Sequence, residues 1–129
     1  MGQTVLTAPT VFSFFSPAYV IPNLTPTTLA PEFQTLNAST ALARANFAYR
    51  AVTNGISGGI QVDLSNLADL ANNPADLVEA ISQALFRGQM DSGMRGILTT
   101  AAGTSTNMTS RVRSALYAAA ASPQFQVQQ

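Results

Sequence analysis

A chain of 129 residues, 47% of them apolar, is long enough to bury the core of one domain without a structural metal or a disulfide. It contains no cysteine, which excludes a disulfide framework and a thiolate metal site. Six arginines balance six carboxylates, there is no lysine or histidine, and a net charge of zero argues against nucleic acid or an anionic membrane as the main partner.

The first 31 residues differ in composition from the rest of the chain. They hold five prolines, several aromatic side chains and no charged residue. Because each proline fixes φ and restricts the residue before it, a continuous helix is excluded here. We therefore predict two parts, an extended apolar arm over residues 1–31 that packs on the body, and a helical domain over residues 32–129. No apolar run reaches the roughly 18–20 residues that a membrane span needs.

The first predicted helix begins at Pro31, a favoured first helical position, and ends at Asn54-Gly55. Its apolar side chains follow two lines, on nearly opposite sides of the helix, with a polar stripe between them. A helix that is apolar on two sides is usually enclosed by its neighbours. We therefore expect this helix to be the central one.

Four more helices are predicted from start and stop signals, over residues 64–71, 74–87, 92–102 and 109–121. Asp63, Asn73 and Asp91 are N-cap candidates, and Gly88 is a stop signal. A final turn is expected after Ser122-Pro123, docked by Phe125 and Val127. The predicted fold class is all-α, a bundle of about five helices with an extended aromatic, proline-rich N-terminal arm.

The arm supplies the candidate interface residues Phe12, Phe14, Phe15 and Tyr19. The later helices are rich in alanine and short of large side chains, so the aromatic rings would provide the missing bulk. We expect Phe12, and at least one of Phe14 and Phe15, to be more than three-quarters buried, since exposed rings would form a large apolar patch on a protein without net charge. The alternative is that these rings contact another chain or a missing domain.

Residues 55–59 match the G-x-S-x-G pattern of serine hydrolases, with Ser57 at the nucleophile position. The pattern normally follows a strand and opens a helix, whereas here it follows a predicted helix. The chain also has no histidine, the usual base that activates a serine. We therefore interpret this segment as a loop and assign no catalytic residue, with a small esterase-like hydrolase using Ser57 as the alternative.

The charged residues have structural explanations. Glu32, Asp76 and Glu79 fall in first turns of predicted helices, where a carboxylate interacts favourably with the helix dipole, so neither a glycosidase pair nor a calcium or magnesium site is favoured. Arg111 and Arg113 form the only basic cluster, which is too small for a nucleic-acid footprint and is expected to make surface ion pairs. We expect no metal and no cofactor.

Three segments, "APTVFSFFSPAY", "APEFQTLNASTALARANF" and the closing "RVRSALYAAAASPQFQVQQ", together resemble the C-terminal portion of a bacterial family catalogued as domain of unknown function 1800. Members of that family carry an "AP-S-VF-NFF-P-Y" segment, a "PEFQ" helix start and a closing "R-R-A-Y-SP-E-Q" helix in this order. They are usually several times longer, so the resemblance implies that this chain is their last portion, cut off or encoded alone.

The same resemblance implies a largely helical N-terminal region as a natural cover for apolar surface, and a bacterial cell-envelope or secreted setting. It supplies no activity and no catalytic residue. The sequence therefore favours a non-catalytic helical interaction or assembly module, whose protein partner is a second copy or that missing region.

Overall fold

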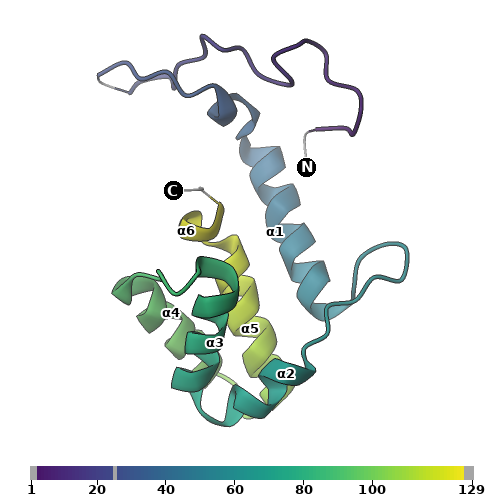
Figure 1. The fold of residues 1–129 in the computed structure, drawn as a ribbon, viewed down its shortest axis with the longest axis vertical. Coiled ribbons are helices and arrows are strands. Elements are labelled where there is room, and N and C mark those ends of the chain that lie inside the picture. Colours follow the sequence, from purple (N-terminus) through teal and green to yellow (C-terminus); the bar gives the residue numbers. More distant parts are fainter. Residues whose placement is uncertain (1–2, 25, 127–129) are drawn as a thin grey trace. The chain divides into compact units, whose positions relative to one another are not determined.

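The computed structural model of the chain describes residues 3–24 and 26–126. Over these residues it contains six α-helices and two 3-10 helices, and its only β-type pairings are three isolated bridges (Figure 1). The prediction of an all-α fold is thus confirmed. The chain divides into two compact units, residues 1–46 and 47–129, which we describe separately.

The first unit holds the proline-rich segment, the 3-10 helix η1 (Pro31–Thr35) and the beginning of α1 (Ala38–Thr53). The prediction of one helix from Pro31 onward is wrong, because the chain leaves helical geometry at Leu36 (ψ 104°). Asn37 then starts α1 as a cap. Its side-chain oxygen accepts from the Thr40 amide at 3.0 Å, while its own amide donates to the Thr40 hydroxyl at 2.9 Å.

The second unit contains the end of α1, α2 (Ser65–Ala68), the 3-10 helix η2 (Asp69–Asn72), α3 (Pro74–Phe86), α4 (Ser92–Gly103), α5 (Met108–Ala121) and α6 (Pro123–Gln126). Helices α3, α4 and α5 pack against one another, and α2 and η2 contact α5 (Figure 1). The predicted helix over residues 64–71 is therefore split into a short α-helix and a 3-10 turn.

The predicted signals act as expected at both ends of α3 and at the start of α4, whereas the N-cap residue of α2 is Leu64 and not Asp63. The Asn73 and Asp91 side chains accept from the amides of Ala75 and Met94, at 3.1 and 2.7 Å. At the end of α3, Gly88 adopts a φ of 78° and its amide donates to the Ser82 carbonyl at 2.9 Å. Both ends of α3 and the start of α4 thus follow from residues within one turn of them.

The core lies where α3, α4 and α5 meet. Its largest fully buried apolar side chains are Leu77, Ile81, Leu98 and Val112. Fully buried alanines of α4 and α5 (Ala102, Ala115 and Ala119) occupy the same cluster. Alanine fills little space but lets helices approach closely, so a few large aliphatic residues are enough to complete this core.

Helix α6 is attached through an aromatic pair. The Phe125 ring meets the Phe86 ring of α3 edge-on, with centroids 6.1 Å apart. The Gln124 side chain also donates to the Gln89 carbonyl at 3.0 Å. Phe125 thus makes the contact expected of it, whereas Val127 lies outside the described residues.

The prediction that the first helix is enclosed on both apolar sides is wrong. Val52 is the only buried residue of α1, and within the second unit Phe47 and Tyr49 keep 36% and 53% of their surface exposed. Near the helix end, the Tyr49 ring meets the Tyr117 ring of α5 edge-on, with centroids 5.9 Å apart. A two-sided apolar pattern shows which faces of a helix can be buried, but burial depends on the neighbours that the rest of the chain provides.

Candidate interaction surface

The predicted interface residues lie on a segment that is folded into turns by its own hydroxyl groups. Thr10 and Ser13 form an isolated bridge in which the Ser13 amide donates to the Thr10 carbonyl at 3.1 Å. The Thr10 hydroxyl also accepts from the Phe12 amide at 3.1 Å. Ser13 adopts a positive φ of 67°, an uncommon conformation for a residue with a side chain. Because the turn reverses the chain here, Val11 and Phe12 occupy its tip.

Two contacts attach this segment to the rest of the first unit. The Gln34 side chain of η1 accepts from the Ser16 amide at 2.6 Å. The Ala30 amide donates to the Tyr19 carbonyl at 3.0 Å, next to an isolated antiparallel bridge between Val20 and Leu29. The segment around Tyr19 is thereby held beside the chain that leads into η1. That this arm also packs on the helical body stays a prediction.

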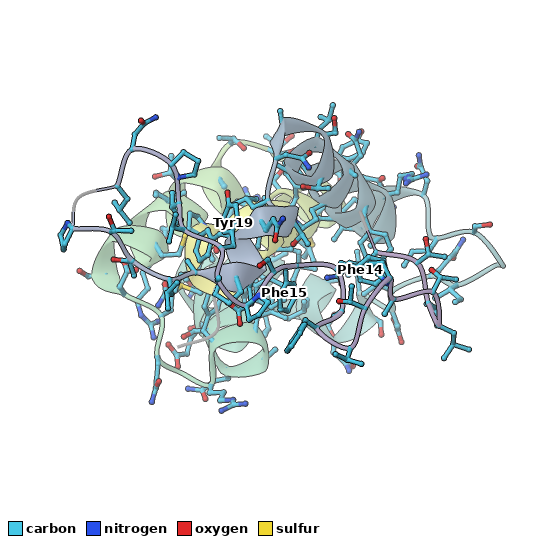
Figure 2. All side chains as sticks on the ribbon, turned by 90° about the horizontal axis from the view of Figure 1, so that it is seen from above. Phe14, Phe15 and Tyr19 are labelled. Atoms are coloured by element: carbon cyan, nitrogen blue, oxygen red, sulfur yellow. The ribbon has the colours of Figure 1, made fainter. Side chains whose placement is uncertain are left out.

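The aromatic side chains differ in exposure. Phe12 keeps 55% of its surface exposed in the described structure, and its burial against the helical body or a partner chain stays a prediction. Phe14, Phe15 and Tyr19 are partly buried. Figure 2 shows these three side chains at separate places along the arm. The two ring–ring pairs found in the described part of the chain both lie in the second unit, so the arm aromatics are not packed as a ring cluster.

Several further apolar residues of the first unit are exposed, and the sequence analysis did not name them as interface residues. We call them, together with Phe12, the unit-1 apolar surface: Val5, Leu6, Val11, Phe12, Val20, Leu24, Leu29, Phe33, Leu36 and Leu42. Val11, at the tip of the turn, is 94% exposed. For the seven of them that precede Pro31, the sequence signal is a run of residues without any charge, in which apolar side chains and uncharged polar ones must share the surface.

The G-x-S-x-G match forms a glycine-dependent loop. It lies between α1 and α2, and the Ile56 amide closes it by donating to the Ile60 carbonyl at 2.7 Å. Gly58 and Gly59 both have positive φ, and Ser57 is exposed. No helix starts at the serine, because α2 begins only at Ser65. The segment therefore lacks the strand-turn-helix geometry that makes a nucleophile elbow.

The only ion pair among the described residues joins α3 to α4. Arg95 Nη1 lies 2.6 Å from Glu79 Oε2, and its Nη2 donates to the buried Ser82 hydroxyl at 3.1 Å. Hydrogen bonds from the Gln83 amide group and then from Arg95 lower the pKa of Glu79 below its ordinary value. Burial acts in the opposite direction on this pKa, and the positive charge of Arg95 adds to the lowering. The pair is half exposed, so it ties two helices together without forming an enclosed charged site.

Arg111, one residue of the basic pair, has a different use from the one predicted. Arg111 makes no ion pair in the described structure. It donates instead to two backbone carbonyls, from Nε to Ser105 at 2.6 Å and from Nη1 to Ala71 at 2.9 Å. The second bond crosses 40 positions and holds η2 against α5. The prediction of a surface ion pair is thus wrong for Arg111, because carbonyls left free at the ends of short helical turns offered acceptors that the sequence does not reveal.

Two remaining observations concern metals and membranes. Over residues 3–24 and 26–126, no three acidic side chains gather in a way that could hold a metal ion. Within the same ranges, none of the helices has the length and the apolar character required to pass through a bilayer.

Comparison with known proteins identified no relative of this chain. The sequence matches no protein-family model, and neither a curated protein nor a solved structure resembles it significantly.

Proposed function

We propose that this chain is a non-catalytic helical interaction or assembly module, and that it binds another protein chain through the first unit. The observation that carries the proposal is the unit-1 apolar surface. Seven of its ten residues precede Glu32, where the chain carries no charge, and exposed apolar side chains gathered in one segment are typical of a protein contact site. Zero net charge adds to this, because it leaves little repulsion between copies.

The four predicted residues contribute unequally to this proposed interface. Phe12 is the best contact residue, since it combines a large ring with a half-exposed surface at the tip of an ordered turn. Phe14, Phe15 and Tyr19 are partly buried, so they serve mainly to support the segment and offer smaller contact areas. The turn and the Gln34 contact preorganise the segment, which reduces the entropy lost on binding.

A resemblance to the end of a longer bacterial family suggests a second source for the partner, an N-terminal region of the same longer protein. We place self-association first, because a single purified chain can test it. Both partners would cover the same apolar residues, and both fit the hypothesis of an envelope or secreted assembly.

The test is sedimentation velocity over a range of concentrations, with Phe12→Glu compared to Ile97→Glu. Ile97 is a matched control, because it is an exposed aliphatic residue on α4 in the second unit, with 59% of its surface exposed. We expect the native chain to form dimers or larger species, Phe12→Glu to shift it toward monomer, and Ile97→Glu to leave it unchanged. A native chain that stays monomeric, with amides of residues 9–21 that exchange as fast as in a random coil, would contradict the proposal.

The alternative of a serine hydrolase is separated by a turnover assay on p-nitrophenyl esters. We expect no hydrolysis above background, and no difference between the native chain and Ser57→Ala. Hydrolysis that disappears in Ser57→Ala would reverse the ranking of the two functions.

A further inference from the structure

Asparagine followed by glycine occurs at one place in this chain, Asn54-Gly55, and the structure explains why the glycine is there. Gly55 has a φ of 80°, and a Cβ added to it would lie 2.8 Å from both the Ile60 carbonyl oxygen and Gln61 Cγ. Any other residue would therefore be strained and would clash with the backbone. The loop that follows α1 therefore requires glycine, the residue without a Cβ, directly after Asn54.

The Asn54 side chain and the Gly55 backbone nitrogen are also free to react with each other. Asn54 lies one residue beyond α1 and is exposed. The backbone N–H of Asn54 still donates to the Arg50 carbonyl at 3.0 Å, so its backbone is held at the helix end. Among the hydrogen bonds of the described residues, none has the Gly55 amide as its donor. The nitrogen that follows the Asn54 side chain is thus free of both a side-chain obstacle and a hydrogen bond.

We propose that Asn54 is a site of spontaneous deamidation in the folded protein. The deprotonated Gly55 nitrogen attacks Asn54 Cγ, a bond forms between these atoms, and the Cγ–Nδ2 bond breaks with release of ammonia. Water then opens the resulting five-membered imide at either carbonyl. One opening yields aspartate and the other isoaspartate, in which the backbone runs through the former side chain. No oxidant, reductant or enzyme is needed.

The other asparagines lack this combination. Asn37, Asn73 and Asn107 use their side-chain oxygens to accept backbone amides at helix starts. Asn46 and Asn66 lie inside α1 and α2, where the backbone is held in helical geometry. Asn23 and Asn72 are exposed, but the residues that follow them carry side chains that hinder the attack. The structure therefore assigns the modification to Asn54 alone.

The product would differ from the native chain in two ways. It adds one negative charge to a protein of zero net charge, at the C-terminal end of α1, where the helix dipole disfavours an anion. The isoaspartate form also lengthens the backbone at the entrance to the loop that the Ile56–Ile60 hydrogen bond closes.

The experiment incubates the folded full chain in mildly alkaline buffer and follows it by anion-exchange chromatography and peptide mapping. We expect a more acidic species to accumulate, with the amide-to-acid mass change at Asn54, isoaspartate exceeding aspartate, and Asn23 and Asn46 unchanged. Asn54→Gln should abolish the acidic species while leaving the helical circular dichroism spectrum intact. Conversion at Asn54 that is no faster than at Asn23, or that occurs only in the urea-unfolded chain, would overturn the proposal.

Discussion

Leu98 offers the sharpest test of the core, because its sequence neighbour provides a matched control. Leu98 is completely buried between α4 and the helices that pack on it, whereas Ile97 on the same helix is mostly exposed. Replacing a buried leucine by alanine costs about 2–5 kcal/mol, with the larger values where the cavity cannot collapse. The cluster around Leu98 includes fully buried alanines, which have no flexible side chain to refill the space. We therefore expect a loss of about 3–4 kcal/mol for Leu98→Ala.

Ile97→Ala should change the free energy of unfolding by less than about 0.5 kcal/mol, since the residue buries little surface and alanine favours the helix. Urea titration followed by far-ultraviolet circular dichroism measures both variants. A loss of 3 kcal/mol corresponds to a fall of at least about 1 M in the urea midpoint. Equal effects at the two positions would show that the inward face of α4 is assigned wrongly, and the packing of α4 on α5 would have to be abandoned.

Two further predictions concern the surface of the second unit. The pKa of Glu79 is lowered in the folded state, so its stabilising effect is present above the unfolded-state pKa and is lost as the pH falls through the folded-state value. The difference in unfolding free energy between the native chain and Glu79→Gln should thus shrink as the pH is lowered, and a difference that stays constant into acid would refute this. Asn107 accepts the Ser110 amide at 3.0 Å, so Asn107→Ala should cost about 0.5–2 kcal/mol and Asn107→Gly only a few tenths, as measured by urea titration. Equal losses for alanine and glycine would mean that capping is not the cause.

The sequence by itself determined the all-α class and most of the boundaries in the second unit. These boundaries are set by residues that act on backbone groups within one turn, so the local sequence is enough to predict them. The residues are Asn73 with Pro74, Gly88 and Asp91. The break before α1 was missed although its signal was also local. Asn37 and Thr40 have the spacing of a reciprocal cap. The prediction started the helix at Pro31 instead, because proline is a favoured first helical residue.

Only the tertiary structure determined which polar groups distant in the sequence form hydrogen bonds with each other. Arg95 pairs with a carboxylate 16 positions away, and Arg111 reaches a carbonyl 40 positions away. Neither sequence separation matches a repeat of a helix or a strand, because such contacts depend on how whole helices pack against one another. The same reason explains the error about α1. Its two apolar faces are visible in the sequence, but within the second unit only the packing of the other helices determines that Val52 is buried and Tyr49 is not.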